Sequence, residues 1–111
     1  MNFDLSIQQD ASVLSIGGAL DAVSVQDLRP VIDQIGEDRP SKVLVDLSCL
    51  RLIDSSGVGA IVALFKKVKA YDGSMAVVGV HDQPLAILRL LRLDRVMTLA
   101  REGQPVTSPS A

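Results

Sequence analysis

The chain has 111 residues, a length that suits one domain with one hydrophobic core and is too short for two. Hydrophobic residues make up 48% of the chain, but aromatic residues only 3%, so the core must be aliphatic. Few rings are available to stack on single-stranded nucleic acid, and a net charge of -2 gives no basic surface for DNA or RNA. These values favour an aliphatic α/β domain and exclude direct nucleic-acid binding.

A single cysteine, Cys49, excludes a disulfide within the chain and disfavours a zinc cluster. We therefore expect no metal and no cofactor, and interpret Cys49 as a small core or loop residue. The first residues contain neither the basic nor the apolar segment of a signal peptide, and no apolar run is long enough to span a bilayer. The expectation is a cytoplasmic protein without membrane insertion, monomeric when free.

The chain begins with a predicted hairpin. Apolar residues alternate with polar ones over residues 3–7, which is the period of a half-buried strand, and a second apolar run covers 13–16. Residues 8–11 suit the turn between them. The glycines of the segment 17–21 are expected to end the second strand.

The first helix is predicted to start at Ser24, an N-cap residue followed three positions later by Asp27, as in a capping box. Pro30 interrupts this pattern, because it removes a backbone hydrogen bond unless regular helix begins only near Arg29. The segment 36–40 is a clear break. The residues expected on the buried helix face are Val25, Leu28, Val31, Ile32 and Ile35.

A continuous apolar stretch at 42–47 predicts a central, buried strand. A second helix follows the serine pair at 55–56 and ends at Asp72-Gly73. Its apolar face comprises Val58, Ile61, Val62, Phe65 and Val68, and its lysines lie mainly on the other side.

Residues 75–80 form another predicted strand. Pro84 suits the first turn of a third helix, and residues 93–97 lead back to the sheet and a short last strand. The inner face of this third helix is expected to comprise Leu85, Leu88 and Leu91.

Single helices between strands imply right-handed parallel crossovers. We therefore predict an α/β single domain over residues 1–102, with a mixed, mostly parallel β-sheet, an N-terminal hairpin and helices packed mainly on one face. The polar, proline-containing segment 103–111 is expected to be a disordered tail.

The run IDSSGVG at residues 53–59 is the most informative segment of the chain. It places Ser55 and Ser56 behind Asp54, where a helix begins. A helix N-terminus offers unpaired N–H groups and a positive dipole end, so it tolerates an added phosphate. Serine is also a preferred N-cap residue, and capping alone would explain both hydroxyls.

The sequence offers no catalytic residues. His81 is the only histidine and is interpreted as a loop or N-cap neighbour, and Ser55 does not lie in a Gly-x-Ser-x-Gly elbow. No nucleotide-binding fingerprint is present, and Gly57 and Gly59 are interpreted as close packing of the helix start against the sheet. We expect a protein that is not an enzyme.

Three arginines recur every third residue near the third helix. Their spacing suits a solvated helix face or part of a partner-docking surface, and it does not separate the two. The residues are Arg89, Arg92 and Arg95.

Three segments resemble one family. The run VLVDLSCLRLIDSSGVG at 43–59 resembles the signature of STAS-domain anti-sigma factor antagonists. GALD at 18–21 is similar to the Gly-Glu-Leu-Asp after that family's second strand, and LDRV at 93–96 is similar to its segment after the third helix. The resemblance covers residues 3–100.

The resemblance implies a bacterial partner-switching protein. In this family the unphosphorylated form binds an anti-sigma factor, often a serine kinase of the GHKL type, and so frees a sigma factor. Phosphorylation of the first serine releases the partner, and a PP2C-type phosphatase reverses it. Carried over, Ser55 is the phosphoacceptor, Asp21 and Asp54 are its acidic neighbours, and Ser56 and Gly57 shape the turn.

The chain departs from the family at three places. Ala19 stands where an acid is usual, Leu91-Arg92 stands where Thr-Gly is common, and the sequence after Arg101 is too short for the usual fourth helix. Other functions therefore stay open. These are a STAS regulator of a kinase, phosphatase or secretion pathway, an accessory subunit of a membrane transporter, and nucleotide or small-ligand binding at the helix N-terminus.

Overall fold

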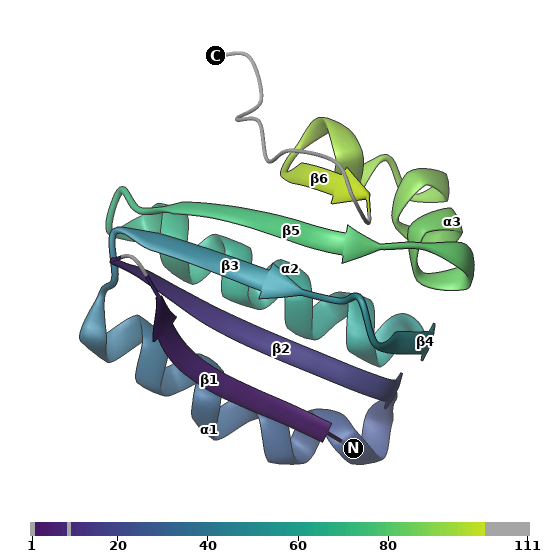
Figure 1. Ribbon diagram of the computed structural model, residues 1–111, viewed down its shortest axis with the longest axis horizontal. Coiled ribbons are helices and arrows are strands. Elements are labelled where there is room, and N and C mark those ends of the chain that lie inside the picture. Colours follow the sequence, from purple (N-terminus) through teal and green to yellow (C-terminus); the bar gives the residue numbers. More distant parts are fainter. Residues whose placement is uncertain (1, 9, 102–111) are drawn as a thin grey trace.

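The computed structural model describes residues 2–8 and 10–101, so Gln9 of the predicted turn and the predicted tail 103–111 lie outside it. The described chain forms a mixed sheet with the order β1-β2-β3-β5-β6, and a short strand β4 pairs with β2 beyond the end of β3 (Figure 1). The β1–β2 pair is antiparallel and the other pairs are parallel. The strands are β1 (Asn2–Gln8), β2 (Ala11–Leu20), β3 (Lys42–Asp46), β4 (Leu50–Ile53), β5 (Ser74–Val80) and β6 (Thr98–Arg101).

The helices are α1 (Ala22–Asp38), α2 (Ser55–Ala70) and α3 (Asp82–Leu90), followed by a 3-10 turn η1 (Leu93–Arg95). Helices α1 and α2 contact each other and cover the same face of the sheet, while α3 lies beside β4 (Figure 1). The predicted class is confirmed: a mostly parallel α/β domain with an N-terminal hairpin and helices mainly on one face. Within the described residues, no helix has the length and apolar character needed to cross a bilayer.

An aliphatic core lies between the sheet and the two long helices, as the scarcity of aromatic residues requires. Alternate residues of the central strands face it, because successive side chains of a strand point to opposite faces. The fully buried residues include Leu14, Ile16, Val43, Val45 and Val77 of the strands, Leu28 and Ile35 of α1, and Ile61, Leu64 and Val68 of α2.

The second strand ends within the predicted segment 17–21, at Leu20, but its two glycines do not stop it. β2 continues to Leu20, because the unpredicted strand β4 pairs with its last residues. The register shifts between Gly18 and Ala19, and Gly18 takes a φ of 78°, a conformation that glycine adopts without a steric penalty. The glycines therefore bend the strand and do not stop it.

Helix α1 begins three residues earlier than predicted. Its N-cap is Asp21, whose carboxylate accepts from the backbone N–H of Ser24, while the Ser24 hydroxyl accepts from the Asp21 N–H. Ser24 is thus the third helical residue of this capping box and not its N-cap. Pro30 lies inside the helix at an exposed position, and the helix ends at Asp38, within the predicted break at 36–40.

The third helix ends at Leu90, so Leu91 lies beyond it and is 51% exposed; its predicted place on the inner face is wrong. Leu85 and Leu88 do face the core. Arg92 then takes a left-handed conformation with a φ of 60°. This conformation suits glycine, and the arginine side chain makes it strained.

Replacing Arg92 by glycine should therefore stabilise the fold by about 0.5–1 kcal/mol, after the greater flexibility of glycine in the unfolded chain is counted. Urea unfolding measures the change. Arg89→Gly is the matched control, since Arg89 lies within α3, where glycine should cost about 1 kcal/mol. Equal destabilisation by both variants would contradict strain at Arg92.

Candidate functional site

Helices α1 and α2 begin side by side at the end of the sheet where β2 and β4 finish. Leu20 and Ile53 are register partners at the ends of β2 and β4, and the next residues, Asp21 and Asp54, are the N-caps of α1 and α2. The Asp54 N–H donates to the Leu20 carbonyl over 3.2 Å, which joins the two turns directly. The predicted site residues Asp21, Asp54 and those following Asp54 are thus brought together.

Asp54, and not a serine, caps α2. Its carboxylate accepts from the Gly57 N–H over 3.0 Å, so capping does not explain the serine hydroxyls. Ser55 is the first helical residue, its side chain is exposed, and it makes no hydrogen bond to another described residue. Ser56 is half-buried. Of the two serines, Ser55 is the more exposed.

Asp21 is held by the start of its own helix. Its carboxylate accepts from the backbone N–H groups of Ser24 (2.9 Å) and Val23 (3.2 Å). Hydrogen bonds from the Ser24 backbone and then from its side chain lower the pKa of Asp21 below its usual value, because they stabilise the carboxylate form. Asp21 is therefore ionised at neutral pH.

This bonding predicts a pH dependence. Because the folded pKa lies below the ordinary 3.8, the unfolded chain takes up its proton first. The stabilisation by the ionised Asp21 carboxylate is full at a pH above its unfolded pKa, and it is lost as the pH falls through its folded pKa. Urea unfolding at pH 7 and pH 3 should show that Asp21→Asn, which keeps a cap, loses less stability on acidification than the unaltered protein. An equal loss of stability in both proteins would contradict this role of the Asp21 carboxylate.

The two glycines of the site differ in role. A Cβ on Gly57 would lie 2.5 Å from the Leu20 carbonyl oxygen and 2.7 Å from Cγ1 of Ile53, so the predicted close packing against the sheet is confirmed there. Gly59 is exposed and a Cβ on it would meet nothing within 4 Å. The same prediction is wrong for Gly59, because that residue faces away from the sheet.

Gly57→Ala should lower the free energy of unfolding by about 1–3 kcal/mol, since the backbone oxygen cannot move aside without disturbing the strand pair. Gly59→Ala is the internal control and should raise it by up to about 1 kcal/mol through helix propensity. Thermal and urea unfolding of both variants checks the difference. If Gly57→Ala left the free energy of unfolding unchanged, α2 would not be packed this closely on the sheet.

A groove of about 370 Å³ runs between α1 and α2, and Ser56 lies on its wall. Arg29 and Lys67 line it, and Lys67 forms an ion pair with Asp33 at 3.5 Å. Its apolar walls are Val25 and Ile32 of α1 and Ala60 and Ala63 of α2.

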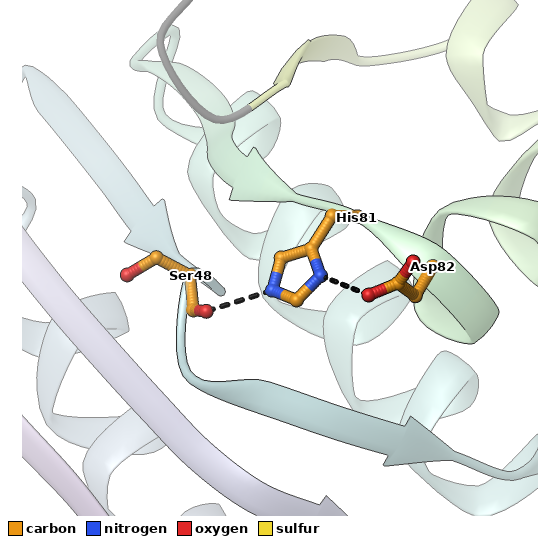
Figure 2. Close-up of polar contacts among 3 residues, drawn as sticks. All are labelled: Ser48, His81 and Asp82. Carbon is orange, nitrogen blue, oxygen red and sulfur yellow. Dashed lines mark hydrogen bonds and ion pairs between the residues drawn. The ribbon is translucent and has the colours of Figure 1, made fainter.

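Sequence reasoning missed the contacts made by the start of α3. His81 is its N-cap residue, as the prediction of an N-cap neighbour suggested, and its ring contacts the Ser48 carbonyl and Asp82 (Figure 2). Gln83 forms two hydrogen bonds with the backbone of Ile53. No local pattern signals a glutamine that pairs with a residue thirty positions away.

The remaining candidates stand as follows. Cys49 is exposed in the segment between β3 and β4, which fits the loop interpretation. Among the described residues, no group of three or more His, Cys, Asp or Glu side chains is arranged to hold a metal ion. The three arginines of the α3 region, Arg89, Arg92 and Arg95, are exposed.

Comparison with known proteins gives one consistent result. A model of the STAS domain family matches residues 2–104. The anti-sigma-B factor antagonist of Staphylococcus aureus strain NCTC 8325 is 26% identical over 106 residues, which cover 96% of this chain and 97% of that protein.

Solved structures agree on the fold. The crystal structure of a candidate anti-sigma factor antagonist from Thermotoga maritima superposes with a TM-score of 0.82 at 25% identity, covering 88% of this chain and 85% of that one. The phosphorylated form of the Bacillus cell fate determinant SpoIIAA gives a TM-score of 0.72 at 21% identity, with 89% and 91% covered. At that identity the second likeness concerns the fold alone.

Proposed function

Since this chain belongs to the STAS domain family, we propose that it is a phosphorylation-regulated, non-catalytic partner-switching protein. In its unphosphorylated form it binds an anti-sigma factor of the GHKL serine kinase type and so frees a sigma factor. Phosphorylation of Ser55 by that kinase releases the partner, and a PP2C-type phosphatase restores binding.

The observation that carries this proposal is the state of Ser55. Its side chain is exposed at the first position of α2, and Asp54 supplies the helix cap. A phosphate can therefore be added without breaking a contact that the fold needs, and it would lie at the positive end of the helix dipole. Ser56 is half-buried on the groove wall and is the poorer acceptor.

The surroundings of Ser55 suit a docked protein. Val23, next to the cap of α1, is 76% exposed, and Leu52 of β4 is 58% exposed. Each of these large apolar side chains lies two residues from a capping aspartate, and the fully buried centre of a protein interface is more apolar than the rest of the surface. An anti-sigma factor as the partner is supported by the Staphylococcus aureus relative, which is an anti-sigma-B factor antagonist.

The switch would act through charge. Phosphorylation adds a charge of about -1.5 to -2 at neutral pH. A like-charge pair about 6 Å apart costs about 3 kcal/mol at an effective dielectric near 20. That energy corresponds to about a hundredfold in affinity for each unit of charge. An acidic partner surface close to Ser55 would thus be released without refolding of this domain.

The direct test is mass spectrometry of the protein purified from its source organism. We expect one phosphate, located on Ser55 by fragmentation and removed by a PP2C-type phosphatase. Ser55→Ala should abolish it and Ser56→Ala should leave it in place. A protein that stays unmodified at Ser55 across growth and stress conditions would overturn the proposal.

Two substitutions separate folding from switching. Because the Ser55 side chain bonds to no other described residue, Ser55→Ala and Ser55→Asp should each change the free energy of unfolding by less than about 1 kcal/mol. Calorimetric titration with the anti-sigma factor should show that Ser55→Ala binds as the unphosphorylated protein does. Ser55→Asp should bind more weakly, though less so than the phosphoprotein. Equal affinity of both variants would contradict a charge-based switch.

A further inference from the structure

The first turn of α3 holds the free edge of β4. The Ile53 N–H donates to Oε1 of Gln83 over 2.9 Å, and Nε2 of Gln83 donates to the Ile53 carbonyl over 2.9 Å. One side-chain amide therefore satisfies both backbone groups of the last residue of β4. Its orientation follows from these partners, because the flipped amide would place like groups together.

This pairing replaces a missing strand. β4 is paired with β2 along one edge, and the backbone groups of Ile53 face the other edge. Two residues of antiparallel strands that exchange both N–H···O bonds form the same double contact. Gln83 thus does for one residue of β4 what a neighbouring strand would do.

A second contact holds the segment before β4. Nε2 of His81 lies 2.8 Å from the Ser48 carbonyl, and Nδ1 lies 2.7 Å from Oδ2 of Asp82, as Figure 2 shows. The chain from Ser48 to Ile53 is therefore tied to the start of α3 at both ends. Helix α3 also packs against β4 itself.

The bond to the Ile53 carbonyl acts on the site directly. That carbonyl and the Asp54 N–H belong to one planar peptide unit. Gln83 binds this unit on one side and the Leu20 carbonyl binds it on the other. The orientation of the unit sets where Asp54 leaves the strand, and so where α2 and Ser55 begin.

We propose that Gln83 is a positioning residue for the phosphoacceptor: it fixes the Ile53–Asp54 peptide, and thereby presents Ser55 to the kinase in one orientation. This inference rests on the proposed function for its kinase, but the positioning itself can be measured on the protein alone.

The first readout is the hydrogen-exchange rate of the Asp54 amide, measured by NMR at a temperature where all variants are folded. Gln83→Ala should speed this exchange at least tenfold, because the peptide loses one of its two anchors. Gln34→Ala is the matched control, since the Gln34 amide bonds the exposed Asp38 on α1, far along the chain from the site. Unchanged exchange at Asp54 in Gln83→Ala would overturn the proposal.

Gln83→Glu separates positioning from simple loss of packing. The protonated acid can donate to the Ile53 carbonyl and accept from its N–H as the amide does, whereas the carboxylate cannot donate. Slow exchange at Asp54, corrected for intrinsic rates, should therefore be restored at low pH and lost as the pH rises. A corrected exchange rate that does not change with pH would contradict the double hydrogen bond.

The phosphorylated fraction of Ser55 in the source organism is the last readout. Gln83→Ala should lower it several-fold relative to the unaltered protein and to Gln34→Ala, with all three equally abundant. Faster exchange at Asp54 with an unchanged phosphorylated fraction would overturn the proposal that Gln83 presents Ser55 to the kinase. Should the unaltered protein carry no phosphate, the proposed function fails, while the exchange data still decide whether Gln83 positions this peptide.

Discussion

The pairing of Leu20 with Ile53 is the contact on which the candidate site depends. It brings together two chain segments that are separated by a helix and a strand, and it does so at the point where both leave the sheet. Asp21 and Asp54 are adjacent for this reason alone. Gly57 belongs to the same constraint, since α2 approaches the Leu20 carbonyl more closely than any side chain would allow. Gln83 closes the arrangement from the far side of β4.

This construction keeps the fold independent of the Ser55 hydroxyl. The groups that hold the site are backbone atoms, two capping carboxylates and one amide, all engaged with partners inside the domain. The Ser55 hydroxyl stands among them without a hydrogen bond to another described residue. A hydroxyl in that position can change its charge while the surrounding hydrogen bonds stay in place, which suits a residue that is modified and restored repeatedly.

Much of this fold could be predicted from the sequence, because local periodicity reports burial. The buried strand at 42–47, the strand at 75–80 and the apolar face of α2 follow directly from it. β4 could not be predicted, since four residues are too few for a periodic signal and the strand exists through its pairing with β2. The cap of α1 differs from the prediction for a related reason. Asp21 and Ser24 are both good caps, and the end of β2 decides between them.

The site was predicted unevenly. The order of a strand, the segment 53–59 and an apolar-periodic helix predicts a helix start there, and the resemblance to the STAS family assigns the segment its function. The prediction for Gly59 is wrong, because this residue lies on the exposed side of α2 and not against the sheet. Gln83 gave no signal, since a glutamine in the first turn of a helix is ordinary and its partner is a backbone thirty residues away. Contacts of side chains with distant backbone are the part that requires coordinates.

The two neighbouring helix starts also define a local charge balance. Each N-terminus contributes about half a positive charge, and each capping aspartate a full negative one. This edge therefore holds about -1 before any modification, and a phosphate on Ser55 would bring it to about -3. The charge of the whole chain, -2 by composition, only doubles. At physiological ionic strength such a field decays within about 8 Å. The added negative charge would therefore act on a partner already bound near Ser55 far more strongly than on one still approaching. It should shorten the lifetime of the complex rather than slow its formation.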